Sequence, residues 1–168
     1  MLTKGFPPIV DDDAACLVLG TMPGVASVLA GQYYAHPRNA FWPIMGELFG
    51  AGPDLSYLQR QSLLLTHQIA VWDVLRCGYR SGSLDANIDL KAAEVNDFLN
   101  FFTEYPGINR VFFNGGVAEK LFRQRVMPIL ITHSIELHCK RLPSTSPAYA
   151  TLGLTEKVAA WRVALVRD

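Results

Sequence analysis

Short apolar runs alternate along the chain with stretches in which apolar residues recur at helical spacing. Four runs have the length of strands and are each followed by a turn or a polar loop. They cover residues 14–19, 69–75, 111–113 and 134–139. Because parallel strands need crossover connections, this order predicts an α/β fold, a three-layer αβα sandwich around a four-stranded, mostly parallel central sheet.

Helical spacing predicts five helices between and after these strands. Gly50 is a natural stop for the first helix, Asp54 an N-cap for the second, and Asp89 or a neighbour a cap for the third. The predicted helices cover residues 41–49, 55–65, 90–102, 117–125 and 155–165.

The connection at residues 20–40 is long for a compact domain, in which most connections have about 4–6 residues. Its aromatic and apolar content argues against disorder, so it predicts a binding loop. A second polar loop is expected at residues 76–87. Ligands of open α/β sheets bind beyond the carboxyl ends of the strands, where Gly20, Asp73 and Asn114 stand here.

The length of 168 residues suits one domain, and no linker-like segment divides residues 1–168. Lys and Arg number 15, as do Asp and Glu, so only a local basic face could attract nucleic acid. No signal-peptide core and no run of about 18 apolar residues is present, which excludes a membrane partner. We expect a soluble, cytoplasmic monomer.

Three cysteines, Cys16, Cys77 and Cys139, are widely separated and form no CxxC pair. They suit a reducing compartment as small buried residues. Cysteines alone could build neither a zinc site nor a four-cysteine iron–sulfur cluster, and we expect no metal and no cofactor.

Three motifs carry a family resemblance. GTMPG lies at residues 20–24, YAHPRNAFW at 34–42 and LPSTSPA at 142–148, with FFNGG between the last two. In order and spacing they resemble the motifs of the uracil-DNA glycosylase superfamily, and among its branches most resemble the hypoxanthine-DNA glycosylase (DNA-deoxyinosine glycosylase) family. The resemblance covers nearly the whole chain.

This resemblance implies a base-excision-repair enzyme that hydrolyses the N-glycosidic bond of a flipped, deaminated base, in this branch hypoxanthine. Most relatives place Asp or Asn inside the first motif to handle water, whereas this chain has Met22, which cannot. The branch implies that Asn39 is the catalytic residue and positions water. As an alternative from the residues alone, Asn39 caps a helix.

The resemblance also implies a base-binding set. Tyr34 would stack on the flipped base, although Tyr33 and Tyr34 could also be core aromatics and one of them is expected to be. Asp73 would read a base edge unless it pairs with Arg76 or Arg80. Asn114 would contact the base or only form a turn. The full expected set is Gly20, Thr21, Met22, Pro23, Tyr34, Asp73 and Asn114.

The expected partner is double- or single-stranded DNA that contains a deaminated base. Hydroxyls and backbone amides of the second motif can hold phosphates, and basic residues lie just before it. Pro147 or Tyr149 could fill the gap left by the flipped nucleotide. The expected DNA-binding residues are His36, Lys140, Arg141, Ser144, Thr145, Ser146 and Tyr149.

Other functions remain open from the sequence. Leu142 stands where some relatives have a His that stabilises the leaving base, which together with Met22 leaves room for a catalytically silent nucleic-acid-binding module. A uracil or G:T/U mismatch glycosylase shares the same motifs. An esterase built from Ser144, His133 and Asp73 is disfavoured, because no G-x-S-x-G elbow is present. No Lys lies in the first motif, so a monofunctional enzyme that uses water is expected.

Overall fold

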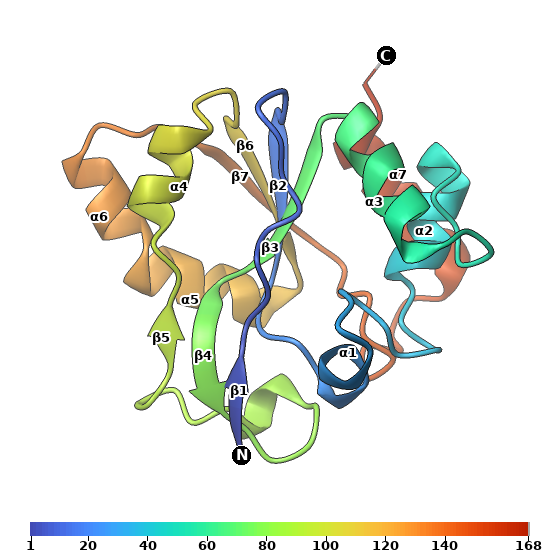
Figure 1. The fold of residues 1–168 in the computed structure, drawn as a ribbon, viewed down its shortest axis with the longest axis horizontal. Coiled ribbons are helices and arrows are strands. Elements are labelled where there is room, and N and C mark those ends of the chain that lie inside the picture. The colour runs from blue at the N-terminus through green and yellow to red at the C-terminus, as the bar shows by residue number, and fades with distance from the viewer. Residues whose placement is uncertain (168) are drawn as a thin grey trace.

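The computed structural model describes residues 1–167, and its centre is a four-stranded sheet in the order β3-β2-β6-β7 (Figure 1). All neighbouring strands in this sheet are parallel. The strands are β3 (Ile69–Asp73), β2 (Cys16–Gly20), β6 (Arg110–Asn114) and β7 (His138–Leu142). The predicted four-stranded sheet is confirmed, and every one of its strand pairs is parallel.

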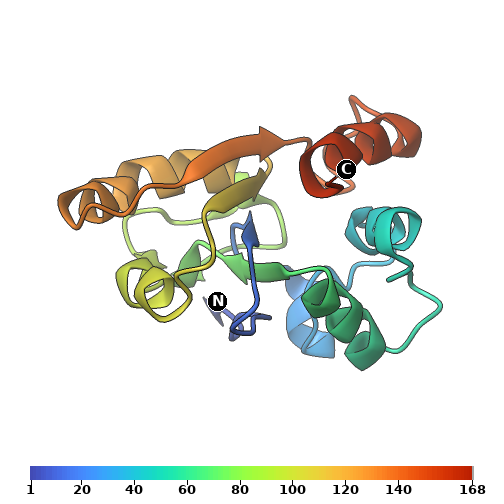
Figure 2. The same ribbon diagram turned by 90° about the horizontal axis from the view of Figure 1, so that it is seen from above.

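Helices cover both faces of this sheet, which confirms the three-layer prediction. One face carries α4 (Phe98–Glu104), α5 (Gly116–Arg125) and α6 (Met127–Thr132), and the other carries α2 (Phe41–Phe49), α3 (Tyr57–Thr66) and α7 (Leu154–Leu165) (Figure 1). The view from above separates the same two groups, with α7 packed on α2 (Figure 2). Strands β2 and β3 are buried along their whole length because both of their faces are covered.

A second, antiparallel sheet was not predicted. It has the order β1-β4-β5, formed by β1 (Leu2–Lys4), β4 (Leu75–Tyr79) and β5 (Glu94–Val95). The predicted strand at 69–75 therefore ends at Asp73, and the expected polar loop at 76–87 is partly strand and partly a short 3-10 helix, η1 (Asp85–Asn87). Only Leu75 and Gly78 of β4 are buried, so the sequence of this strand resembles a loop.

Three predicted boundaries were wrong because side-chain caps and sheet pairing fix the ends. Helix α3 is capped by Ser56 in a capping box with Gln59, not by Asp54. Helix α4 is capped by Asp97, whose carboxylate accepts a hydrogen bond from the amide of Asn100, and not by Asp89. The last strand begins four residues after the predicted start, because α6, which was not predicted, occupies the stretch before it.

The long connection after β2 holds one more element, α1 (Val25–Ala30). It ends at Gly31 in the left-handed conformation, with φ of 65°. Tyr34 is also left-handed, with φ of 55°, which is uncommon for a residue with a side chain. The connection is therefore ordered, as expected, and turns sharply on both sides of the Tyr pair.

Candidate active site

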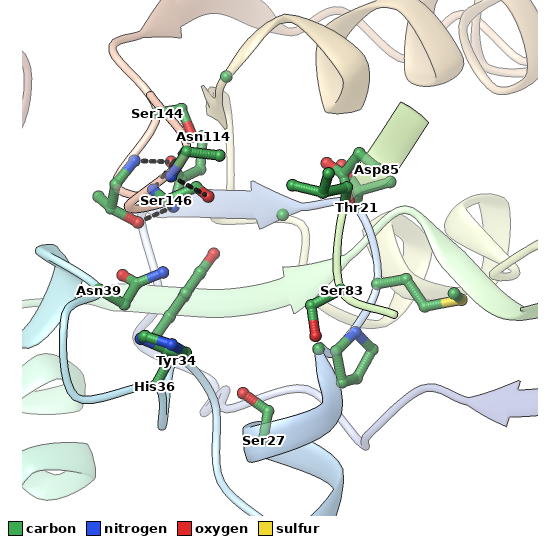
Figure 3. Close-up of a pocket in the computed structure, with 18 of the residues that line it drawn as sticks. Thr21, Ser27, Tyr34, His36, Asn39, Ser83, Asp85, Asn114, Ser144 and Ser146 are labelled. Atoms are coloured by element: carbon green, nitrogen blue, oxygen red, sulfur yellow. Dashed lines mark hydrogen bonds between the residues drawn. The ribbon is translucent and has the colours of Figure 1, made fainter. Parts of the chain in front are cut away.

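A cavity of about 720 Å³ lies at the carboxyl ends of the four parallel strands. Figure 3 shows its ring of polar side chains, with Asn39, Tyr34 and His36 on one side and Thr21 and Asp85 on the other. The cavity is lined by these predicted residues: Gly20, Thr21, Met22, Pro23, Tyr34, His36, Asn39, Asp73, Asn114, Ser144, Thr145, Ser146 and Tyr149.

Two predicted DNA-binding residues, Lys140 and Arg141, do not line the cavity. Both are exposed on β7, and Arg141 Nε lies 3.7 Å from Glu119 Oε1. A contact between either residue and a DNA phosphate stays a prediction.

Gly20 ends β2 at the cavity and is closely approached by two side chains. A Cβ at this position would lie 2.5 Å from Asp73 Oδ1 and 2.9 Å from the Tyr34 hydroxyl. Both distances are too short for any contact with a methyl group, so the first motif needs glycine here. The same register pairs Gly20 with Asp73 across the two parallel strands.

Asp73 is buried at the end of β3, with an exposed fraction of 4%. Its Oδ2 atom has no hydrogen-bond partner among the described residues. The alternative ion pairs are wrong, because Arg76 pairs with Glu94 and Arg80 with Asp85. Burial raises the pKa of Asp73 to about 7, with Asp85 adding to the effect and Arg80 opposing it.

Tyr34 presents an aromatic wall to the cavity. Its ring stacks on Phe41, with centroids 4.1 Å apart and an angle of 27°. Its hydroxyl points towards Asn114 but has no hydrogen-bond partner among the described residues (Figure 3). Burial and the nearby Asp73 raise the pKa of Tyr34, so the hydroxyl is protonated. Tyr33 belongs to the core, as was expected of one of the two Tyr, and donates to the carbonyl of Pro7 at 2.9 Å.

Asn39 lies at the edge of the cavity, between Tyr34 and Ser146 (Figure 3). Its Oδ1 atom accepts a hydrogen bond of 2.9 Å from the amide of Phe41, at the start of α2. The predicted N-cap is wrong, because Ala40 is the N-cap residue of α2 and Asn39 precedes it, but this bond still holds the side-chain amide in one orientation. The bond and a role at the cavity are compatible, because the carbonyl oxygen keeps a second lone pair and Nδ2 keeps its two N–H donors.

Asn114 and Thr145 form a clamp across the end of the sheet. Asn114 Nδ2 donates to Thr145 Oγ1 and Asn114 Oδ1 accepts from the Thr145 amide, both at 2.9 Å. The Thr145 carbonyl accepts from the amide of Ala40 at 2.9 Å, so the clamp also holds the start of α2. Thr145 is only 1% exposed, and we revise its role from phosphate contact to positioning. Asn114 keeps one N–H and one lone pair for a ligand.

Three residues of the predicted DNA-binding set, His36, Ser144 and Ser146, line the cavity and keep hydrogen-bond donors free. His36 Nδ1 accepts a hydrogen bond of 3.0 Å from the Arg38 amide, which places the proton of the neutral ring on Nε2. Ser144 and Ser146 accept bonds from amides two residues on, so their O–H groups can donate elsewhere. These groups suit contacts with phosphate oxygens.

The opposite rim was missed from the sequence. Arg80, the residue after β4, is 5% exposed and donates to the carbonyls of Pro23 and Gly82, and its Nη1 lies 3.3 Å from Asp85 Oδ1. It thus ties the first motif to the 82–85 turn. The cavity residues that this turn and the long connection add are Ser27, Arg38, Ser83 and Asp85. A basic residue five positions before an acidic one in a Gly/Ser stretch was the available signal.

Two positions that relatives use for chemistry are apolar here. Met22 is 7% exposed and Leu142 is 2% exposed, so neither offers a polar group to the cavity. His133 follows α6 with its Nδ1 atom 2.9 Å from the Ile129 carbonyl, and it is not among the cavity residues. The esterase triad is therefore not assembled.

Residues 1–167 hold neither a cluster of metal-binding side chains nor a membrane-spanning helix. No group of three or more His, Cys, Asp or Glu in this range could hold a metal ion. No helix in it is long and apolar enough to cross a membrane.

A parallel sheet with a cavity at its carboxyl ends, an aromatic wall and buried polar groups without partners defines an α/β protein that binds a small planar ligand at this edge. The family model of the uracil DNA glycosylase superfamily matches residues 7–168. The chain belongs to this superfamily, as its motifs indicated.

Similar proteins agree with this assignment. A hypoxanthine DNA glycosylase of Methanosarcina barkeri is 37% identical over 68% of this chain and 72% of its own length. A hypoxanthine DNA glycosylase of Methanosarcina acetivorans is 35% identical over 73% of this chain and 79% of its own. The solution NMR structure of a candidate uracil DNA glycosylase from Methanosarcina acetivorans superposes with a TM-score of 0.76, at 30% identity, over 97% of this chain and 98% of the other.

Proposed function

We propose that the protein is a monofunctional DNA glycosylase that uses water to release hypoxanthine from deoxyinosine in DNA. The observation that carries this proposal is the cavity at the sheet edge, in which the Tyr34 ring and the Asp73 carboxyl face the space for a base. The two hypoxanthine DNA glycosylases at 37% and 35% identity support the choice of base.

The geometry suits a flipped base. A base inside a duplex cannot reach a buried carboxyl, so the nucleotide must leave the stack, at a cost of a few kcal/mol. The orientation of the Tyr34 ring is fixed by its stacking on Phe41 and by the left-handed backbone at Tyr34, so the ring offers a fixed stacking surface. Stacking of a base on an aromatic side chain contributes about 1–3 kcal/mol, which offsets part of the unstacking cost.

Asn39 is the residue that we propose positions the water. Its side-chain amide is fixed by the hydrogen bond from the Phe41 amide and it lies at the cavity edge, whereas Met22 has no group that binds water. An amide is a poor base, so the contribution comes from placing water against the sugar carbon rather than from removing its proton.

The enzyme would act as a cytoplasmic monomer on double- or single-stranded DNA. Ser144, Ser146 and His36 keep donors at the rim for phosphates. Lys140 and Arg141 add positive charge on the neighbouring strand. Light scattering of the protein with and without a duplex would measure the oligomeric state, and matched single- and double-stranded substrates would measure the strand preference.

The test is single-turnover excision from oligonucleotides that contain one hypoxanthine, one uracil or one G:T mismatch. We expect abasic product from the hypoxanthine substrate at the highest rate. Asn39→Ser, whose hydroxyl can still accept from the Phe41 amide, should lose about 10²–10³-fold in rate. Asn100→Ala, an exposed Asn of α4, is the matched control and should keep the wild-type rate.

Either of two results would refute the proposal. Salt-sensitive DNA binding without abasic product would identify a silent binding module, and faster release of uracil than of hypoxanthine would identify a uracil glycosylase. A folded Asn39→Ser variant with the wild-type rate would refute only the role of Asn39.

A further inference from the structure

The buried carboxyl of Asp73 is the one acid in the floor of the cavity that forms no ion pair among the described residues. Its Oδ2 atom has no partner, and its Oδ1 atom lies against Gly20. The other acid of the cavity, Asp85, is held by Arg80 at the opposite rim. Asp73 thus lines the cavity with a carboxyl group that no ion pair occupies.

Departure of a purine leaves an electron pair on the base, which a proton or a strong donor must stabilise. Leu142 is apolar and buried, so the position that could hold a His in relatives has no donor. The His36 ring lies at the rim, with its Nδ1 already bonded to the Arg38 amide. Asp73 is the buried group of the cavity that can carry a transferable proton.

We propose that Asp73 is the general acid of the reaction and delivers its carboxyl proton to N7 of the leaving hypoxanthine. This inference rests on the proposed function. As the bond between C1′ and N9 breaks, its electron pair goes to the purine ring, which already holds the Asp73 proton on N7. Hypoxanthine leaves as the neutral N7–H tautomer. Water adds to C1′, and its released proton returns through solvent to the Asp73 carboxylate, so the acid is regenerated.

The surroundings keep this acid protonated near neutral pH. Burial is the main cause, and it raises the pKa of Asp73 to about 7. The charged or titratable groups around it are the Tyr33 and Tyr34 hydroxyls from the long connection, the Tyr57 hydroxyl from α3, Arg80 just after β4 and Asp85 from η1. The three Tyr hydroxyls are protonated because burial raises the pKa of each, and Arg80 is shared with Asp85. An acid with this pKa is well matched to proton transfer at pH 7.

The same acid gives a chemical reason for a purine preference. Hypoxanthine has a basic ring nitrogen at N7, whereas uracil has none in its pyrimidine ring. Proton transfer therefore accelerates the departure of hypoxanthine and cannot act in the same way on uracil.

The experiment is a double cycle measured by single-turnover excision. Wild type and Asp73→Asn are each assayed on deoxyinosine and on 7-deaza-deoxyinosine, which has C–H in place of N7. We expect Asp73→Asn to lose about 10²–10⁴-fold on deoxyinosine, the usual range for a general acid. The loss caused by 7-deaza substitution should be at least tenfold smaller in Asp73→Asn than in wild type, because both changes remove the same proton transfer. The intrinsic difference between the two substrates cancels in the cycle.

A pH profile supplies the second readout. The wild-type rate on deoxyinosine should fall as pH rises through about 7, since only the acid form donates, and the Asp73→Asn rate should not. Asp12→Asn, an exposed acid outside the cavity, is the matched control, and thermal unfolding checks that each variant is folded.

Each outcome decides between the two proposals. Equal 7-deaza effects in wild type and Asp73→Asn, or a wild-type rate without the fall near pH 7, would overturn the general acid while leaving the glycosylase in place. Wild-type protein that releases no hypoxanthine would overturn the proposed function and this inference with it. If Asp73→Asn fails to fold, the wild-type pH profile on the two substrates still decides, because the fall should be absent with 7-deaza-deoxyinosine.

Discussion

The two sides of the cavity treat their buried polar groups in opposite ways. On one side, Asn114 and Thr145 satisfy each other through two hydrogen bonds, and Thr145 also holds Ala40. On the other side, Asp73 Oδ2 and the Tyr34 hydroxyl are buried without partners among residues 1–167. An unsatisfied buried polar group costs roughly 1–3 kcal/mol. The difference separates a scaffold from a surface that is completed by a ligand.

The comparison is sharp because Asp73 and Asn114 occupy similar positions. Each is the last residue of a parallel strand, and both strands pair directly with β2. The clamp holds the loop after β7 through three hydrogen bonds, and the unpaired side would supply the acid of the proposed reaction. Three changes would break or sharpen this division, with expected effects that decrease in the order given.

The largest expected effect is the pH dependence of stability caused by Asp73. The pKa of Asp73 is about 7 when folded and 3.8 as the reference value, so the unfolded chain loses this proton at lower pH than the folded protein. The contribution of Asp73 to stability is therefore full below pH 4 and is lost as pH rises to 7. The free energy of unfolding should fall by roughly 4 kcal/mol over this range relative to Asp73→Asn.

Urea unfolding of both proteins at several pH values would measure this difference. The comparison with Asp73→Asn removes the contributions of other titrating groups, which are the same in both proteins. If the difference in free energy of unfolding between the two proteins stays constant from pH 4 to 8, Asp73 is ionised throughout this range in the folded protein. Its burial without a partner would then not destabilise the fold at neutral pH.

Much of the central fold was predictable because three of its strands are nearly uniform apolar runs between Gly, Pro or Asn breaks. The small sheet was not, because β4 buries only Leu75 and Gly78, which do not alternate, and β1 and β5 have three and two residues. Strand β7 was predicted four residues too early, because Lys140 and Arg141 are exposed on this edge strand and make its sequence resemble a polar loop. Pairing with β6, which is a long-range contact, fixes its position.

The sequence predicted which residues lie at the site, but not which of them would contact a ligand and which would only position other residues. The motifs gave Tyr34 and Asn39, the end of the second predicted strand gave Asp73, and all three line the cavity. No local pattern distinguishes an Asn that binds a base from one that clamps a loop 31 residues away, as Asn114 does. Arg80 was considered only as a partner of Asp73, whereas the fold gives it to Asp85 and to the carbonyl of Pro23.

An intermediate effect is expected when the clamp is opened. Thr145→Val keeps the volume but leaves Asn114 Nδ2 without its buried acceptor, so the free energy of unfolding should fall by about 1–3 kcal/mol. Thr103→Val is the matched control, because Thr103 is exposed and its hydroxyl donates within one helix. It should change stability by less than about 0.5 kcal/mol. Equal values for the two variants would show that the clamp is not a scaffold.

The smallest expected effect is the removal of the unpaired hydroxyl by Tyr34→Phe. Because this hydroxyl has no partner, its loss should leave the free energy of unfolding within ~0.5 kcal/mol of wild type or raise it. Tyr33→Phe is the matched comparison, since it removes a bond of 2.9 Å to the Pro7 carbonyl and should cost about 0.5–1.5 kcal/mol.

The effect of Tyr34→Phe on DNA binding should differ from its effect on stability. The variant should bind hypoxanthine-containing DNA more weakly than wild type, because a donor that faces the base is gone. Denaturation and binding titrations on the two variants would measure both quantities. A Tyr34→Phe protein less stable than Tyr33→Phe would mean that the hydroxyl belongs to the scaffold after all.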